Sequence, residues 1–188
     1  MSFEMTMPYE RPDDAEKVDV AEHYKIEQFL FREAQALDER RFDSWLAMFS
    51  EDLLYEAPAR YNRLPRQRAK EWSGAKEAKH FEDTKEFLRM RVRRLKTDKS
   101  WSEDPPSRTR HLISNVQVSW SKSTNTYLAD SNFVVYRARA SDDEETFYGA
   151  RHDLISPGGD GSDGLLIQRR TILFDHTVIL AANLGIFF

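Results

Sequence analysis

A switch in the spacing of apolar residues, halfway along the chain, is the feature that most constrains the fold. Residues 18–49 place apolar side chains at the spacing of an α-helix, and residues 53–57 have the pattern of a short strand that Pro58 ends. From Arg108 onward apolar and polar residues alternate with a period of two, in runs separated by turn-forming residues. This order predicts an α+β fold in which N-terminal helices pack on one curved antiparallel sheet.

Three helices are predicted in the first half of the chain. Asp19 and Glu22 have the spacing of a capping box that opens the first helix, and a shorter second helix follows after a turn. We expect the third helix to start near Phe81, because Asp83 and Glu86 form another capping-box pair. The first helix should bury a stripe that comprises Ile26, Leu30, Ala34 and Leu37.

The second half predicts an antiparallel meander of strands over residues 108–120, 127–136, 146–155 and 165–174. In the first of these strands His111 and Asn115 are expected on one face, and Leu112 and Val118 on the other. A loop rich in glycine and aspartate, residues 157–164, separates the last two strands.

Length and composition indicate one globular domain. The chain has 188 residues, of which 40% are hydrophobic and 32% are charged. Residues 18–188 are expected to form the domain, and residues 1–17, which are polar, an extended arm. The formal net charge of −4 argues against general nucleic-acid binding, which needs a basic surface.

The absence of cysteine limits the chemistry of the chain. With Cys 0, it has no disulfide, no thiolate nucleophile and no thiolate ligand for an iron–sulfur cluster or zinc. No N-terminal segment has the pattern of a signal peptide, and the most apolar stretch, residues 178–188, is shorter than the roughly 20 residues of a membrane span. We therefore expect a cytoplasmic protein without a membrane partner.

A pocket for acid–base chemistry is one interpretation of the polar side chains. The candidate catalytic residues are Tyr55, His111, Asp130, His152 and Asp153. An Asp that faces His111 would complete a dyad, although a hydrogen-bonded structural histidine is the interpretation we favour. His152 and Asp153 are neighbours, so on a strand they point to opposite faces and cannot share one site.

Metal binding by this chain is not predicted. His23 and Glu27 have helical i, i+4 spacing, but two ligands are too few for a 2-His-1-carboxylate iron site. The loop around Asp160 and Asp163 lacks the ligand spacing and final glutamate of an EF-hand.

Three segments together resemble a known family. Residues 42–58 (FDSWLAMFSEDLLYEAP), residues 105–116 (PPSRTRHLISNV) and the stretch that ends in Phe187 and Phe188 are similar to the small (β) subunit of aromatic ring-hydroxylating dioxygenases, nearest the biphenyl and toluene/benzene branch. The resemblance covers roughly residues 18 to 188. It implies the cone-shaped α+β fold of the nuclear transport factor 2-like superfamily.

The resemblance also implies a function. In that family the large α subunit carries a Rieske [2Fe–2S] centre and a mononuclear Fe(II), and the β subunit carries no cofactor and forms the trimer core of an α3β3 hexamer. A biphenyl 2,3-dioxygenase-like complex adds both atoms of O2 to an aromatic hydrocarbon, giving a cis-dihydrodiol, with electrons from NADH by way of a reductase and a ferredoxin. This chain would then have a structural role. The alternative is a stand-alone cone-fold isomerase, dehydratase or hydrolase with an acid–base pocket.

Contact with other subunits would use aromatic and arginine side chains, which are enriched at interfaces. The candidate interface residues are Trp72, Trp101, Arg66, Arg68, Arg108 and Phe188.

Overall fold

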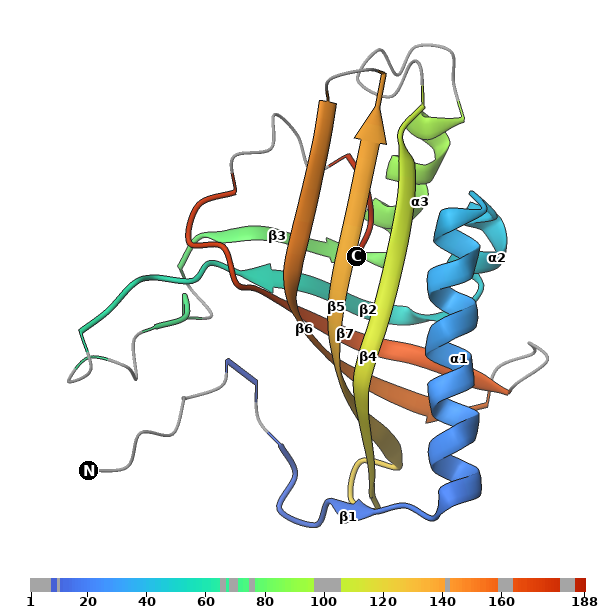
Figure 1. Cartoon of the computed structure of the whole chain (residues 1–188). Coiled ribbons are helices and arrows are strands. Elements are labelled where there is room, and N and C mark those ends of the chain that lie inside the picture. The colour runs from blue at the N-terminus through green and yellow to red at the C-terminus, as the bar shows by residue number, and fades with distance from the viewer. Residues whose placement is uncertain are drawn as a thin grey trace.

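A computed structural model describes residues 8–9, 11–64, 67, 71–74, 77–96, 106–140, 143–158, 164–179 and 185–188. Within these ranges the strands form one seven-stranded sheet with the order β1-β4-β5-β6-β7-β2-β3, and the helices lie against it (Figure 1). The elements are β1 (Glu16–Lys17), α1 (Val20–Asp38), α2 (Phe42–Leu46), β2 (Phe49–Pro58), β3 (Lys79–Thr84), α3 (Lys85–Leu95), β4 (Arg108–Ser121), β5 (Thr126–Arg139), β6 (Asp143–Pro157) and β7 (Leu165–Phe174).

The prediction of a curved sheet with helices packed on it is confirmed. Strands β4 to β7 form the predicted antiparallel meander. The sheet as a whole is mixed, because β2 pairs in parallel with β7. The long strands bend strongly along their length, and α1 lies beside β4 (Figure 1). No helix in the described ranges is long and apolar enough to cross a membrane.

Helix α1 begins and buries its apolar stripe as predicted. Asp19 is the N-cap, and its carboxylate accepts a hydrogen bond of 2.8 Å from the main-chain N–H of Glu22. The stripe of Ile26, Leu30, Ala34 and Leu37 is buried. Arg40, just beyond the helix, adopts a left-handed φ of 56° and so turns the chain toward α2.

The predicted start of the third helix was wrong. Phe81 lies in β3, where it pairs with Ala57 of β2, and α3 begins only at Lys85. Thr84 provides the N-cap and accepts a hydrogen bond from the N–H of Phe87. Pairing with β2 outweighs the local capping signal, and it places the Phe81 ring on Tyr55 at 5.6 Å between centroids.

The predicted alternation along β4 was also wrong. The β4–β5 register shifts between Ser114 and Gln117, where Asn115 adopts a left-handed φ of 53°. This bulge changes which face each following residue occupies. Consequently His111 and Val118 are both buried, whereas Leu112 is 58% exposed.

The described part of the N-terminal arm lies on the sheet. Glu16 and Lys17 pair with β4, and Arg11 forms a salt bridge of 2.8 Å with Asp130 of β5. Asp14 accepts hydrogen bonds from Ser121 at the end of β4. The division into an arm of residues 1–17 and a domain of residues 18–188 stays a prediction.

The core combines aliphatic and aromatic side chains and lies between the helices and the inner face of the sheet. Gly149 of β6 stands between Phe133 and Phe174 in the strand register. A Cβ at Gly149 would lie 2.2 Å from the main-chain oxygen of Leu173 and 2.9 Å from the Phe133 ring, so the close approach of β7 requires glycine. The chain ends inside the curve of the sheet (Figure 1). Residues 186–188 are buried there.

Candidate functional site

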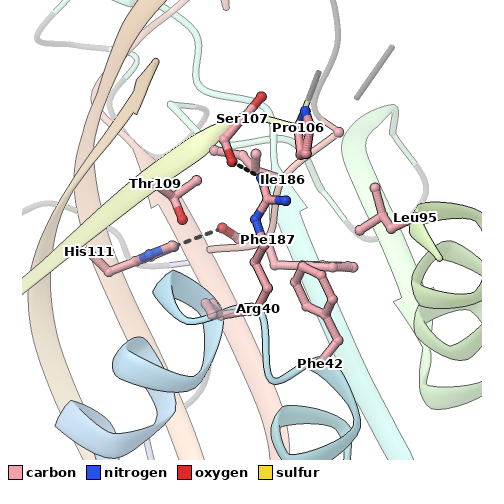
Figure 2. A pocket seen from close by; sticks show the side chains of 11 residues that line it. Arg40, Phe42, Leu95, Pro106, Ser107, Thr109, His111, Ile186 and Phe187 are labelled. Carbon is pink, nitrogen blue, oxygen red and sulfur yellow. Dashed lines mark hydrogen bonds between the residues drawn. The ribbon is translucent and has the colours of Figure 1, made fainter. Parts of the chain in front are cut away.

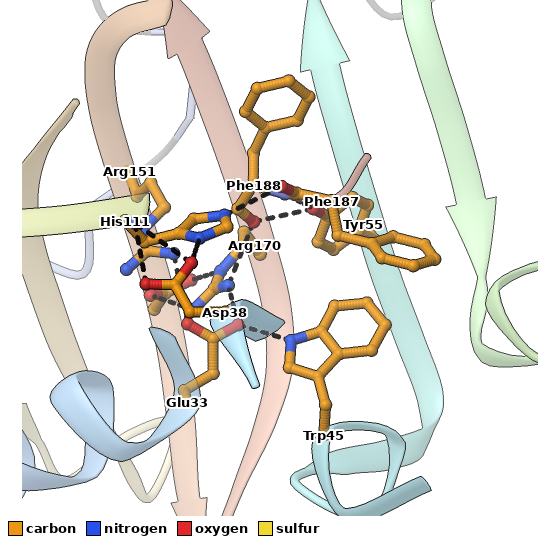
Figure 3. A network of polar contacts seen from close by, with 10 residues as sticks. Glu33, Asp38, Trp45, Tyr55, His111, Arg151, Arg170, Phe187 and Phe188 are labelled. Carbon is orange, nitrogen blue, oxygen red and sulfur yellow. Dashed lines mark hydrogen bonds and ion pairs between the residues drawn. The ribbon is translucent and has the colours of Figure 1, made fainter. Parts of the chain in front are cut away.

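Four charged side chains are buried on the inner face of the sheet. Glu33 comes from α1, Arg151 from β6 and Arg170 from β7 (Figure 3). The fourth, Asp153, also comes from β6. Arg170 donates to the two Asp153 oxygens at 2.8 and 3.0 Å and to Glu33 at 2.7 Å. Arg151 donates to Glu33 at 3.2 Å. The two positive and two negative charges compensate one another, as a buried cluster requires.

The position of each member of this cluster follows from the local structure. Arg170 lies directly opposite Asp153 in the β6–β7 register, where side chains on one face are in contact. Glu33 lies on the buried stripe of α1 and also accepts a hydrogen bond of 2.5 Å from Trp45 Nε1. Burial alone would raise the pKa of Glu33, but Arg170 and Arg151 outweigh it and hold the pKa well below its usual value.

His111 binds the end of α1 to the last residues of the chain. Its Nδ1 lies 2.6 Å from an Asp38 carboxylate oxygen, and its Nε2 lies 3.1 Å from the main-chain oxygen of Phe187. Asp38 also accepts the main-chain N–H of His111 at 3.0 Å. Both ring nitrogens of His111 are therefore engaged by oxygen atoms of the protein.

Tyr55 of β2 fixes the last residue in the same region. Its hydroxyl donates to the main-chain oxygen of Phe188 at 2.7 Å and accepts from the Phe188 N–H at 2.7 Å. Arg170 Nη1 adds a hydrogen bond of 3.1 Å to the same oxygen. Burial is the main cause that raises the pKa of Tyr55 to about 12, so the hydroxyl keeps its proton.

Aromatic side chains pack around the last two residues of the chain. The Phe187 ring lies 4.4 Å from Trp45 between ring centroids, and the Arg91 guanidinium stands 4.5 Å from the Phe187 centroid. The Phe188 ring packs against aromatic side chains of three strands, namely Phe133, Phe147 and Phe174. The cone interior is therefore filled by residues of the chain itself.

A second histidine–aspartate pair lies on the outer face of the sheet. His152 Nδ1 and an Asp130 oxygen are 2.7 Å apart, and the Tyr9 ring stacks on the imidazole at 3.9 Å. Burial would raise the pKa of Asp130, but the hydrogen bond to His152 and the nearby Arg11 lower it. A cavity of about 20 Å³ lies beneath Tyr9, and His152 Nε2 has no hydrogen-bond partner among the described residues. A cavity of this size holds about one water molecule.

The predicted acid–base residues do not meet in one site. Tyr55, His111 and Asp153 belong to the inner face, and Asp130 belongs to the outer face. His152 and Asp153 point to opposite faces, as predicted from their adjacency. The Asp that faces His111 is Asp38.

A small pocket borders the filled interior, between the end of α1, α3 and the start of β4 (Figure 2). Its volume is about 60 Å³. Phe42, Leu95 and Ile186 supply apolar walls, and Arg40, whose guanidinium donates to the main-chain oxygen of Ser107, lies at its polar side. Among the described residues that line it the histidine is His111, both of whose nitrogens are engaged, so these residues present no free imidazole base.

Metal ligation finds no support in the part of the chain that the structure describes. There, no three His, Asp or Glu side chains are grouped as a metal site would require.

The candidate interface residues differ in their surroundings. Trp72 is 8% exposed and forms an isolated antiparallel β-bridge with Arg60. The Arg60 guanidinium lies 5.1 Å from the centroid of the Trp72 ring. Arg108 is exposed at the start of β4, and Phe188 is 1% exposed. Trp101, Arg66 and Arg68 lie outside the described residues. A role for any of these residues in subunit contact stays a prediction.

Sequence reasoning singled out Asp153 but missed the other three members of the charged cluster, Glu33, Arg151 and Arg170. Glu33 was the available signal, because it falls between Leu30 and Leu37 on a stripe that is otherwise apolar. Arg151 and Arg170 gave no comparable signal, since charged residues in strands are usually solvent-exposed.

A family model and individual relatives of this chain indicate the same protein family. The family model described as ring hydroxylating beta subunit matches residues 32–181. The chain is 42% identical over 171 residues to the β subunit of biphenyl 2,3-dioxygenase from Rhodococcus jostii (strain RHA1), covering 91% of each chain. It is 41% identical over 165 residues to the β subunit of benzene 1,2-dioxygenase from Pseudomonas putida (strain F1), covering 88% of each.

Solved structures agree on the fold. A chain of naphthalene 1,2-dioxygenase, solved with indole bound in the active site, superposes with a TM-score of 0.80 at 22% identity, covering 91% of this chain and 88% of that one. A putative scytalone dehydratase from Novosphingobium aromaticivorans gives a TM-score of 0.58 at 16% identity, covering 88% and 95%. These matches show that the cone fold occurs both in dioxygenase complexes and outside them.

Proposed function

This chain belongs to the ring-hydroxylating dioxygenase β-subunit family, and from that membership we propose that it is a structural subunit which assembles with a large α subunit into an α3β3 hexamer. It is a component of an oxidoreductase complex. Its own contribution to turnover is to position the large subunits, not to supply reacting groups.

The observation that carries this proposal is the filled interior of the cone. An acid–base pocket needs a titratable group that can reach a substrate. Here His111 has both nitrogens engaged, and the Tyr55 hydroxyl both donates to and accepts from Phe188. Asp153 is held by Arg170. These contacts support a scaffold and count against the stand-alone isomerase, dehydratase or hydrolase.

The donor groups of this chain do not fit the iron centres of such a complex. A Rieske centre takes two cysteine and two histidine ligands, and the chain has Cys 0. A mononuclear iron site takes two histidines and a carboxylate, and the described residues contain no such group. We propose that the Rieske [2Fe–2S] centre and the mononuclear Fe(II) both reside in the α subunit.

The names of the relatives suggest the substrate class. Two of them are subunits of biphenyl and benzene dioxygenases. We propose that the complete complex, in the cytoplasm, dihydroxylates an aromatic hydrocarbon to a cis-dihydrodiol, with electrons from NADH delivered through a reductase and a ferredoxin.

The test of this proposal is the size and composition of the assembly. The chain should be co-expressed with its α subunit and measured by light scattering coupled to size exclusion. We expect a single species with three copies of each chain, with iron found in the complex but not in the separately purified β chain. A monomer that does not bind the α subunit, or about one iron per β chain, would contradict the proposal.

A further inference from the structure

The three aromatic side chains around Phe188 form a box that is suited to a free aromatic ring. We propose that the cone interior is an aromatic-binding site which the chain fills with its own Phe188 side chain, and that a single-ring hydrocarbon such as benzene binds in its place when that side chain is removed. This inference does not depend on the assembly proposed above, because it concerns the β chain alone.

The geometry around Phe188 is that of a bound ligand. The ring meets Phe174 at 4.9 Å between centroids and 89° between planes, and Phe147 at 5.1 Å and 80°. Phe133 completes the box at 6.2 Å and 51°. Edge-to-face contacts at these distances are the arrangement that the quadrupoles of aromatic rings favour. Phe188 is 1% exposed, so the protein around it covers the residue almost completely.

The walls of the box are rigid. Phe133, Phe147 and Phe174 lie on β5, β6 and β7, and β6 is paired with both of its neighbours, β5 and β7. Gly149 stands between Phe133 and Phe174 in that register and leaves the space that the Phe133 ring needs. Walls of this kind relax only partly when a side chain between them is removed, so a cavity remains.

The main chain of Phe188 is held independently of its ring. Tyr55 binds both the N–H and the oxygen at 2.7 Å, and Arg170 binds the same oxygen at 3.1 Å. His111 holds the preceding residue through the Phe187 oxygen. Removal of the ring in Phe188→Ala should therefore leave the main chain of residues 187–188 in place and empty only the space between the three phenylalanine rings. Apolar cavities of this type stay dry and bind benzene.

The experiment compares benzene binding by the full-length wild type and two variants. Phe188→Ala empties the box, and Phe87→Ala removes the same side chain from α3, where it is 55% exposed. At about five times its Kd, benzene should raise the Tm of Phe188→Ala by about 2–4 °C, and a crystal soaked with benzene should show the ring between Phe133, Phe147 and Phe174. The wild type and Phe87→Ala should show no shift.

Cyclohexane tests whether the site selects aromatic rings. It is close to benzene in size but lacks the ring quadrupole, so its shift should be smaller. An equal shift with cyclohexane, or no shift and no bound benzene in Phe188→Ala, would overturn the inference. If Phe188→Ala does not fold alone, refolding with benzene present should restore folded protein, and failure of that rescue would also overturn it.

Discussion

The hydroxyl of Tyr55 binds both main-chain polar groups of Phe188, donating to its oxygen and accepting from its N–H, each at 2.7 Å. The two residues are 133 positions apart in the sequence. This pairing joins β2 to the end of the chain at the centre of the core. A tyrosine that was a candidate catalytic residue therefore has a structural partner for each hydrogen-bonding function of its hydroxyl.

Removal of that hydroxyl should destabilise the protein. Tyr55→Phe leaves the buried N–H of Phe188 without its acceptor, and an unsatisfied buried polar group costs about 1–3 kcal/mol. The free energy of unfolding from urea titration should fall by that amount. Tyr24→Phe is the matched control, because Tyr24 is 61% exposed and its change should leave stability unaltered. Equal stability of the two variants would show that the Tyr55 contacts contribute nothing.

The buried cluster predicts a loss of stability in acid. The pKa of Glu33 is lowered in the folded protein, so its carboxylate contributes stability that is present above the unfolded-state pKa of about 4.3 and is lost as pH falls toward the folded-state value. The Tm of the wild type should therefore decline as pH drops below about 5.

The Glu33→Gln variant distinguishes the contribution of Glu33 to the pH dependence of stability from the contributions of the other carboxylates. The variant should be less stable than the wild type at pH 7, because it leaves the charges of Arg151 and Arg170 undercompensated in a buried site. The gap in Tm between the two proteins should narrow as pH falls. A difference in Tm between the two proteins that stays constant from pH 7 down to the lowest pH at which both fold would contradict the assignment of a lowered pKa to Glu33.

A methyl group at Gly149 should be poorly tolerated. Gly149→Ala places a Cβ 2.2 Å from the main-chain oxygen of Leu173, which cannot move without disturbing β7. We expect the free energy of unfolding to fall by about 1–3 kcal/mol. Gly74→Ala is the control, since a Cβ there meets nothing within 4 Å. Comparable stabilities for the two variants would mean that β6 and β7 separate more easily than their register indicates.

The elements that the sequence predicted are those with a strong local signal. Helix α1 has both a capping residue, Asp19, and an uninterrupted apolar stripe, and the meander strands alternate clearly between turns. The start of the third helix was mispredicted near Phe81 because nearby residues have the spacing of a capping box. The interaction that determines the strand instead, the pairing of Phe81 with Ala57, joins residues that are distant in the sequence. The alternation along β4 was mispredicted because the bulge depends on one residue, Asn115, in the left-handed conformation. Such a bulge does not show in the periodic pattern of apolar residues.

The site was predictable only in part. His111 was interpreted as a hydrogen-bonded structural histidine, with a facing aspartate as the alternative, and Asp38 at the end of α1 is the aspartate that it contacts. Its second partner, the Phe187 oxygen, is a main-chain atom, and no side-chain pattern identifies which main-chain atom a histidine will meet. The same holds for Tyr55 and Phe188. Both contacts arise when the end of the chain enters the curve of the sheet, which is a property of the tertiary fold.

Turnover per assembled complex with a His111→Ala β chain tests most directly whether this subunit is a scaffold. The hexamer should be reconstituted with wild-type or variant β chain, and oxidation of an aromatic hydrocarbon should be normalised to assembled complex. We predict a rate within about twofold of wild type, with a lower Tm, because a structural histidine leaves unpaired partners that cost about 1–3 kcal/mol. A general acid or base contributes about 10²–10⁴-fold. A fall of that size, with assembly, iron content and Tm unchanged, would place chemistry in this chain and contradict the account.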